Sequence, residues 1–484
     1  MSGRDKVSNH IAKRLKREVG TVFGVTGGCV VNLVDSMYKE GLSIVPMHHE
    51  QSASIAADAY ARFTGFGCCY GTSGPGNTNL ITGTACSYYD SVPVLTIGGQ
   101  VPRKFLTGKD RQIGFQETAG VEIFKPITKY SKRMDNLEDL EDAIHYAKSG
   151  RQGPSFLEIP DDYQREEVES LERKKMYCPD MLAYFGQVKK DIQKAKKPLL
   201  IIGAGARDMD LKLEVPFLYT WGVKDKFYNH PYAKGDFGIT GSPNGNRLTK
   251  ESDLVVMIGT KMDTHQVPNW EDFAPQAKKI AVGLSFPHEV DKKYSGVLKN
   301  YSTIHLRGND WGQREENTTK GELYDFIDKL SDEASPEDII IPDMGQTGCI
   351  ALQRWKVKGG QRLFNGFNHS PMGYSLPAAI GATTATGRPV KAIVGDGSFM
   401  MNLHDLATIG ERKLPVEVYV VNNGGYGMIR QTQKDWEQYL NQDVACSFNF
   451  PNFERLGREL GVNVKEVNIK DTTISPKWKW GTKL

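Results

Sequence analysis

Residues 390–427 read VKAIVGDGSFMMNLHDLATIGERKLPVEVYVVNNGGYG, and this stretch decides the fold of the last third of the chain. Ala392–Val394 is a short apolar run that predicts a buried strand, and Gly395–Gly397 predicts a tight turn after it. Asn402 is placed to cap a helix of about ten residues that a proline ends. A second β-branched run, Val416–Val421, then completes a βαβ unit.

Oxygen ligands follow both predicted strands. Asp396 comes after the first strand, and Asn423 stands in an Asn-Asn-Gly-Gly turn after the second. Strand ends of a parallel βαβ unit meet at one edge of the sheet, so one ion could reach both side chains and a carbonyl near Gly425. Such ligands suit Mg²⁺ or Ca²⁺ shared with a diphosphate, toward which the amides of Gly397 and Ser398 would point. Either turn alone would be ordinary, but together they favour a cofactor site.

The order GDGS, helix, strand and NN resembles the signature of thiamine-diphosphate-dependent enzymes. The resemblance implies that thiamine diphosphate is the cofactor. It also implies that Mg²⁺ is held by Asp396, Asn423 and the carbonyl of Gly425. Cofactor contacts near this stretch are expected at Gly395, Gly397, Ser398, Gly427 and Met428.

Composition narrows the class of protein further. The chain has 484 residues, 39% of them hydrophobic, with a net charge of +3. This length predicts about three domains, and the low charge without a basic block disfavours nucleic acid or membrane partners. No apolar run reaches the roughly 18 residues of a membrane span, and the start lacks the apolar core of a signal peptide. Seven scattered cysteines without a CxxC pair indicate free thiols, no zinc site and a cytoplasmic location.

The hydrophobic pattern predicts an α/β protein of three consecutive blocks. By resemblance, these are doubly wound parallel-sheet domains that bind pyrimidine (1–175), form the centre (182–312) and bind diphosphate (325–484). The last domain is expected to be incomplete, because KDTTISPKWKWGTKL after the final predicted strand has neither a period nor an apolar core. A naturally shortened variant and the product of a frameshift or gene split are both compatible with this pattern.

In the first block, the predicted strand Ile44–Met47 leads through His48 and His49 to Glu50 and an Ala-rich helix. A carboxylate is favourable at a helix N-terminus, so Glu50 alone could simply start the helix. However, FGVTGG, HHEQSASIAADAYAR, TSGPGNTNL, DSVPVLTIGGQV and GFQE resemble, in order and spacing, the acetolactate synthase branch of these enzymes. That resemblance implies that Glu50 shares a proton with the cofactor's N1′. His48 and His49 are alternative acid–base groups.

The resemblance implies further site residues in addition to Glu50 and the metal ligands. Met372, between a proline and a glycine, would hold the two cofactor rings in a V shape, although core packing would also explain it. Phe115 and Gln116 are weak candidates for the substrate pocket. Other expected cofactor contacts are Gly27, Gly28, Thr72, Gly76, Asn77, Gln346 and Ser370.

The central block raises the question of FAD, which acetolactate synthases hold in their middle domain. The Gly turn of KPLLIIGAGARD follows a predicted strand, but a lone short Gly turn is weak evidence for a dinucleotide. The chain departs from the family at Lys261, Val267–Pro268 and Val282–Leu284. We therefore expect a structural spacer without FAD, and bound FAD is the alternative.

The resemblance implies a carboligase that decarboxylates a 2-oxo acid, with pyruvate favoured, and transfers the acyl-anion equivalent to a carbonyl acceptor. QIGFQE, PMGY and NNGGYGMIRQTQ resemble acetolactate-synthase-like proteins of surface-sugar pathways, so the acceptor is a 2-oxo acid or a keto sugar. A simple 2-oxo acid decarboxylase and a non-catalytic cofactor-binding subunit are the alternatives. Family members grip each cofactor between two subunits, which predicts a homodimer or homotetramer with the site at the subunit interface.

Overall fold

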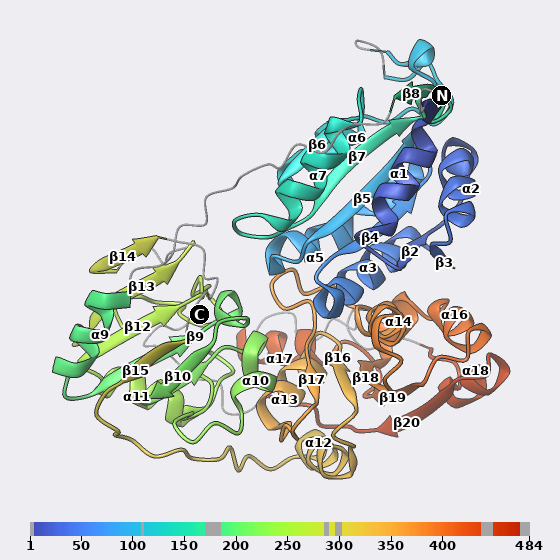
Figure 1. The fold of residues 1–484 in the computed structure, drawn as a ribbon. Coiled ribbons are helices and arrows are strands. Elements are labelled where there is room, and N and C mark those ends of the chain that lie inside the picture. The colour runs from blue at the N-terminus through green and yellow to red at the C-terminus, as the bar shows by residue number, and fades with distance from the viewer. Residues whose placement is uncertain are drawn as a thin grey trace. The chain divides into compact units, whose positions relative to one another are not determined.

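The computed structural model describes residues 4–107, 111–169, 185–284, 290–295, 303–436 and 449–474 (Figure 1). The chain forms two compact units, which are described separately. The first unit comprises Met1–Cys178, Asn365–Val420 and Phe450–Glu466. The second unit comprises Pro179–Phe364, Val421–Asn449 and Val467–Leu484.

The first unit contains a six-stranded parallel sheet of order β3-β2-β4-β5-β7-β6, with helices on both of its faces (Figure 1). Its strands are β2 (Thr21–Gly24), β3 (Ser43–Pro46), β4 (Gly67–Gly71), β5 (Val94–Gln100), β6 (Tyr130–Arg133) and β7 (Ser155–Pro160). Its helices are α1 (Val7–Lys16), α2 (Val31–Lys39), α3 (Glu50–Thr64), α4 (Pro75–Asn79), α5 (Ile81–Asp90), α6 (Gly120–Phe124), α7 (Glu138–Lys148) and α8 (Asp161–Gln164). A small antiparallel pair joins β1 (Arg4–Lys6) and β8 (Glu167–Glu169).

The βαβ stretch predicted from residues 390–427 lies in a second five-stranded sheet of order β17-β16-β18-β19-β20. Its strands are β16 (Ile339–Pro342), β17 (Arg362–Leu363), β18 (Val390–Gly395), β19 (Val416–Asn422) and β20 (Asn463–Asn468). The helices of this part of the chain are α12 (Glu322–Glu333), α13 (Gln346–Arg354), α14 (Ser375–Thr386), α15 (Asp396–Met401), α16 (Asp405–Glu411), α17 (Gly427–Trp436) and α18 (Phe453–Glu459). The strands predicted before and after residue 400 are therefore both present.

The central block forms a parallel sheet of order β11-β9-β12-β13-β14, with a buried apolar cluster on each face. Its strands are β9 (Pro198–Ile202), β11 (Phe217–Tyr219), β12 (Leu254–Ile258), β13 (Lys278–Gly283) and β14 (Lys292–Ser295). A separate parallel pair joins β10 (Leu211–Glu214) and β15 (Ile304–Arg307), and the helices are α9 (Phe185–Lys194), α10 (Lys224–Phe227) and α11 (Pro243–Glu251). Short 3-10 helices are η1 (Gly28–Val30), η2 (Arg103–Phe105), η3 (Lys125–Ile127), η4 (Ala204–Ala206) and η5 (Trp221–Val223).

Two details predicted between β18 and β19 are wrong. The turn predicted at Gly395–Gly397 is the start of α15, because Gly395 is extended at the N-cap and the helix begins at Asp396. Asn402 caps no helix: it ends α15, and α16 begins three residues later without a side-chain cap. The Asn402 amide donates instead to Ser52 Oγ (2.9 Å) and Asp405 Oδ2 (3.2 Å). The predicted helix corresponds to α16, whereas α15 forms before Asn402, where only a turn was predicted.

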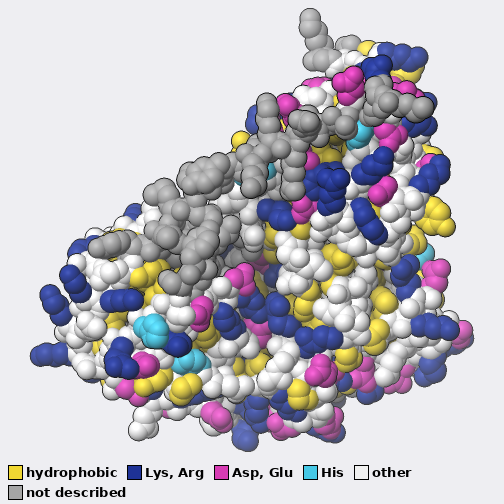
Figure 2. Space-filling model, viewed as in Figure 1, with side chains coloured by type: hydrophobic (Ala, Val, Ile, Leu, Met, Phe, Trp, Pro, Cys, Tyr) yellow, Lys and Arg dark blue, Asp and Glu magenta, His cyan; other side chains and the backbone are white. Residues whose placement is uncertain are grey.

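The mixed surface charges and the free cysteines are those that the sequence composition predicts. Figure 2 shows Lys and Arg side chains interspersed with Asp and Glu across the visible face. Among the described cysteines, Cys29, Cys68, Cys69, Cys86 and Cys349 are free. Where the chain is described, none of its helices is both long and apolar enough to cross a bilayer. The expectation of an incomplete last block concerns residues 470–484, of which 475–484 lie outside the described residues.

Candidate active site

Glu50 is the first residue of α3 and is 8% exposed. His49 is the N-cap residue, and its Nδ1 accepts a hydrogen bond from the Gln51 amide (3.0 Å). A carboxylate in this first turn lies at the positive end of the helix dipole. Asn79 of α4 donates to Glu50 Oε2 (3.0 Å), and no other described residue donates to the carboxyl. Its second oxygen, Oε1, is thus available to a ligand.

The opposite face of α3 contacts a polar cluster of α15 and α16. Ser52 Oγ donates to Asp405 Oδ2 (2.9 Å) and lies 3.1 Å from His404 Nε2. Burial raises the pKa of Asp405 to about 7, although hydrogen bonds from Ser52 and Asn402 oppose the rise. Burial and the nearby His49 and His48 lower the pKa of His404. Sequence reasoning missed Ser52, His404 and Asp405, whose partners lie about 350 positions away.

Four of the predicted cofactor residues of the first block lie where the loop after β2, with Gly27, packs against the turn after β4, with Thr72, Gly76 and Asn77. A Cβ at Gly27 would lie 2.7 Å from the Thr72 side chain, and one at Gly76 would lie 2.9 Å from it. Thr72 Oγ1 accepts a hydrogen bond from the Cys29 amide (3.3 Å). Asn77 is fully buried and donates to the carbonyl of Gly99 (3.1 Å), so its contact here serves the packing of the turn. The fifth, Gly28, has no atom within 4 Å of its Cβ position.

Phe115 and Gln116 lie in a loop next to that turn. Phe115 is 86% exposed, and Gln116 has a positive φ of 65° beside Gly74. Glu117, which sequence reasoning missed, closes this loop because its carboxylate accepts amide hydrogen bonds from Thr107 (2.7 Å), Ile113 (2.9 Å) and Gly114 (3.2 Å). An exposed aromatic side chain on such a fixed loop is available to a ligand or to another chain.

Asp396 starts α15 and is almost completely buried, as are Gly397 and Ser398. Its Oδ1 accepts a hydrogen bond from the Gly397 amide (2.6 Å). The loop before α14 carries Ser370 in the left-handed region (φ 58°) and a half-buried Met372. Gly373 follows with φ 85°, and a Cβ there would lie 2.5 Å from Asn402 Oδ1. Residues with positive φ therefore lie on both sides of the predicted wedge, and the non-glycine Ser370 is the strained one.

The second unit gathers the other predicted residues around Gln346, the first residue of α13. Gln346 Nε2 donates to Gln431 Oε1 (2.7 Å), and its Oε1 accepts from the Thr472 hydroxyl. Thr472 Oγ1 also accepts from Asn423 Nδ2 (2.9 Å). A Cβ at Gly427 would overlap Gln346 Oε1, which explains the glycine. Sequence reasoning found Gln346, Asn423 and Gly427 but missed Gln431 and Thr472.

The turn between β19 and α17 is shaped by glycines. Gly424 and Gly425 have positive φ values of 76° and 142°, and the Gly425 carbonyl accepts from the Gly427 amide (3.1 Å). The next residue, Met428, lies half-buried in the first turn of α17. The described residues contain no group of three or more His, Cys, Asp or Glu side chains that could hold a metal.

The chain belongs to the thiamine pyrophosphate enzyme family. Its sequence matches the N-terminal TPP binding domain over residues 5–123, the central domain over 186–304 and the C-terminal TPP binding domain over 343–479. This match confirms the predicted family and the order of three α/β blocks.

Within that family, the chain is similar to acetolactate synthase large subunits. It is 31% identical to the isozyme 2 large subunit of Escherichia coli (strain K12) over 500 residues, which cover 94% of this chain and 89% of that protein. It is also 31% identical to the large subunit of Porphyra purpurea over 512 residues, covering 94% of this chain and 86% of that protein. The predicted likeness to this branch is confirmed.

The residues present fit thiamine diphosphate with a divalent ion. Glu50 offers a buried carboxyl oxygen, and the side chains and carbonyls of the Asp396 and Asn423 turns are hard oxygen donors. Among the described glycines with no atom within 4 Å of an added Cβ, Gly28, Gly345 and Gly424 lie next to predicted site residues. Two of these, Gly345 and Gly424, have positive φ and leave room for a ligand next to the backbone.

Proposed function

We propose that this chain is a thiamine-diphosphate-dependent carboligase that decarboxylates a 2-oxo acid, with pyruvate as the first candidate. It would transfer the acyl-anion equivalent to the carbonyl of a second 2-oxo acid or a keto sugar. The observation that carries the proposal is the buried Glu50 carboxyl at the start of α3, with one oxygen available. The similarity to acetolactate synthase large subunits favours this reaction over other reactions of the family.

Thiamine diphosphate, when bound, would supply a nucleophilic carbon for a carbonyl group and an electron-poor ring that takes up the electron pair left by CO₂. Glu50 would hold a proton at its carboxyl and share it with the N1′ of the cofactor, while Asn79 fixes the other oxygen. Met372 would pack against the rings of the cofactor, and the backbone at Ser370 would bind the pyrimidine. Asp396, Asn423 and the Gly425 carbonyl would hold Mg²⁺, a role supported by the adjacency of β18 and β19 in the sheet order.

The cofactor site would lie between two copies of the chain. Glu50 and Ser52 are two residues apart on α3, which separates their side chains by about 200° around the helix axis. Ser52 faces Asn402 and Asp405 of its own chain, whereas Glu50 faces Asn79. The direction of Glu50 supports a homodimer or homotetramer in which this carboxyl meets the third block of a partner.

A product analysis tests the reaction. Purified chain with thiamine diphosphate, Mg²⁺ and pyruvate is expected to release CO₂ and to form a new C–C bond with one member of a panel of 2-oxo acids and keto sugars. Acetaldehyde as the only product would favour the decarboxylase alternative. Cofactor binding without CO₂ release would favour a non-catalytic subunit, and the absence of both would refute the proposal.

Three further predictions belong to this proposal. The central block is expected to work without FAD, which the absence of flavin absorbance in the purified protein would support.

The protein is expected in the cytoplasm, with small molecules and further copies of itself as its partners. The boundaries of the three blocks at 1–175, 182–312 and 325–484 stay predictions that limited proteolysis can test.

A further inference from the structure

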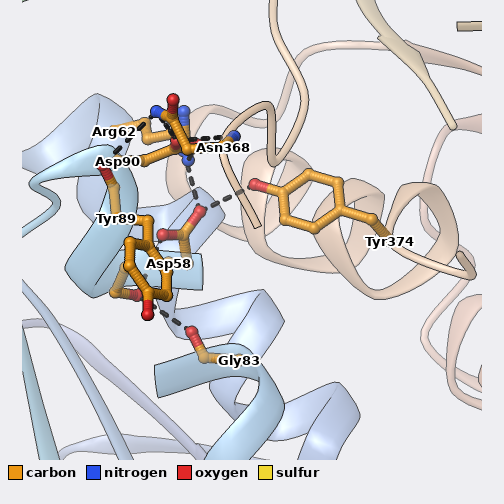
Figure 3. A network of polar contacts seen from close by, with 8 residues as sticks. Asp58, Arg62, Gly83, Tyr89, Asp90, Asn368 and Tyr374 are labelled. Carbon is orange, nitrogen blue, oxygen red and sulfur yellow. Dashed lines mark hydrogen bonds and ion pairs between the residues drawn. The ribbon is translucent and has the colours of Figure 1, made fainter. Parts of the chain in front are cut away.

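A network of polar contacts, buried at Asp58 and Tyr374 and exposed at Asn368, holds the loop between β17 and α14 at both of its ends (Figure 3). Asn368 is near the start of the loop, and its amide (3.2 Å) and side chain (2.5 Å) both donate to Asp90 Oδ1 of α5. Tyr374 is at its end, and the phenol donates to Asp58 Oδ1 of α3 (2.7 Å). Ser370 and Met372, the two predicted cofactor contacts, lie between these anchors.

The two anchors are joined by one guanidinium. Arg62 Nε donates to Asp58 Oδ1 (2.8 Å), and Arg62 Nη2 donates to Asp90 Oδ2 (2.7 Å). The planar fork of an arginine can bridge two carboxylates in this way, whereas a lysine presents a single point charge. Both ends of the loop are thus fixed relative to each other through α3, the helix that Glu50 begins.

The buried end of the network is well satisfied. Asp58 and Tyr374 are fully buried, and the second oxygen of Asp58 accepts from Ser87 Oγ (2.9 Å). Burial raises the pKa of Tyr374 well above its usual value, so the phenol keeps its proton and acts as a donor. The stacking of Tyr89 on His369, with 5.5 Å between ring centroids, adds a third contact at the start of the loop.

The loop needs such anchors because its middle is strained. Ser370 at φ 58° and Gly373 at φ 85° are in the left-handed region, which a non-glycine residue occupies only when its surroundings hold it there. The Ser370 amide donates to the Gly366 carbonyl (2.8 Å), a local bond that closes the turn but does not fix its direction. The contacts of Asn368 with α5 and of Tyr374 with α3 hold the two ends of the loop and so orient the turn between them.

We propose that Asp58, Arg62 and Asp90 form a positioning network that holds the Ser370–Met372 loop ready for thiamine diphosphate. The inference rests on the proposed function. None of the three residues touches the cofactor in this scheme; they act through Asn368 and Tyr374. The network would raise the fraction of molecules whose loop is competent to bind, and apparent affinity falls in proportion when that fraction falls.

Tyr374→Phe is the test variant, because it removes one hydroxyl and keeps the ring. Tyr324→Phe is the matched control. Tyr324 is also buried, and its hydroxyl donates to Gln353 Oε1 (2.9 Å), which is not part of the network or of the loop. Arg62→Lys is a second variant, which keeps the charge but not the fork. Two readouts are measured on the full chain: the Kd for thiamine diphosphate with Mg²⁺, and amide hydrogen exchange of residues 365–374 without cofactor.

Tyr374→Phe is expected to speed exchange in residues 365–374 and to weaken cofactor binding about tenfold. The KM for thiamine diphosphate should rise similarly, while kcat at saturating cofactor stays within about threefold, because bound cofactor restores the loop. Arg62→Lys should act in the same direction, and Tyr324→Phe should change none of these values.

Unchanged exchange and a Kd within about twofold of wild type in Tyr374→Phe would overturn the positioning role, as would an equal effect of Tyr324→Phe. If the wild-type chain binds no thiamine diphosphate, the proposed function is refuted, and so is the proposed effect of the network on cofactor affinity. Faster loop exchange in Tyr374→Phe would then show a network that orders the loop for packing alone. These outcomes keep the two proposals distinguishable.

Discussion

Asp405 is fully buried at the start of α16, where Ser52 and Asn402 each donate to its Oδ2. Its other oxygen, Oδ1, has no hydrogen-bond partner among the described residues. Burial of a carboxylate with one unsatisfied oxygen favours its protonated form, which explains the rise of its pKa to about 7. His404, the nearest ring, has a lowered pKa and therefore tends to stay neutral.

The titration of Asp405 predicts a stability that depends on pH. Between its ordinary pKa of 3.8 and its folded-state pKa of about 7, the folded state binds more protons than the unfolded state. Stability contributed by this group is therefore present below that window and is lost as pH rises through it. Asp405→Asn should remove this loss and stabilise the protein at neutral pH by on the order of a few kcal/mol.

Urea unfolding of both proteins between pH 4.5 and pH 8, roughly the window of the titration, measures the effect. His404 contributes a trend of opposite sign, because a histidine with a lowered pKa loses stability as pH falls. Since both proteins keep His404, the difference between their two profiles reports Asp405 together with its interaction with His404, whose Nε2 lies 3.8 Å from Asp405 Oδ1. Parallel profiles would show that Asp405 is ionised in the folded state throughout.

Glu50 supplies the second prediction at the scale of one residue. Glu50→Gln keeps the shape of the side chain and an acceptor for Asn79, but it cannot share a carboxyl proton. We expect the Kd for thiamine diphosphate to change by less than about threefold and kcat to fall by on the order of 10²–10⁴. Single-turnover CO₂ release separates the two effects. If the variant retained turnover, another group would have to carry the acid–base role, and His49 would be the next candidate.

Helix α3 shows how far one element could be predicted from its sequence. The Ala-rich run after HHE predicted a helix with Glu50 at its N-terminus, and both features are present, because a carboxylate in the first turn and small residues inside it are local preferences. The small residues also allow a close approach to α14, where a Cβ at Gly381 would overlap the Ala56 carbonyl oxygen. That contact joins positions 325 residues apart, and nothing local in the sequence predicts it.

The close approach of α3 and α14 gives a prediction at the scale of elements. Gly381→Ala would gain helix propensity, but its Cβ would meet a main-chain oxygen that cannot move aside without shifting α3. We expect a net destabilisation of about 1–3 kcal/mol by urea unfolding. Gly359→Ala is the control, since nothing lies within 4 Å of its Cβ position, and it should change stability by less than about 0.5 kcal/mol. An unchanged Gly381→Ala variant would show that the two helices are farther apart.

The segment between β18 and β19 shows where sequence reasoning fails. The strands on either side of it follow from apolar and β-branched runs and were predictable, whereas the turn predicted at Gly395–Gly397 is the start of α15. Asn402 has the side chain of a helix cap, but Ser52 and Asp405 compete for its amide. Gln431 and Thr472 likewise join the candidate site through contacts with Gln346, which is 85 and 126 positions away. Polar residues whose partners are distant in sequence carry no local signal.

At the scale of the whole molecule, the direction of the Glu50 carboxyl decides how many chains build one site. Ser52 of α3 is held by Asn402 and Asp405 of its own chain, and Glu50 lies about 200° away around the same helix. A homodimer with two-fold symmetry would bring each Glu50 to the Asp396 turn of the other chain. This arrangement would contain two equivalent sites, each with residues from both chains.

Mixing two inactive variants tests this arrangement. Glu50→Gln and Asp396→Asn should each be inactive alone, since the first lacks the acid and the second lacks a metal ligand. In a mixed dimer, one site carries both substitutions and the other carries neither, because each site takes Glu50 from one chain and Asp396 from the other. Random pairing of equal amounts after co-expression should therefore restore about a quarter of the wild-type CO₂ release.

A site built within one chain predicts the opposite result, because every site of every mixed dimer would then keep one substitution and remain inactive. The control is a mixture of wild type with a double variant carrying both substitutions. If sites are shared, each mixed dimer has one substituted residue in each site and is inactive, so activity falls to about a quarter; with independent sites it falls only to about a half. The two mixtures together fix which chain supplies Glu50, and the result requires no knowledge of the acceptor.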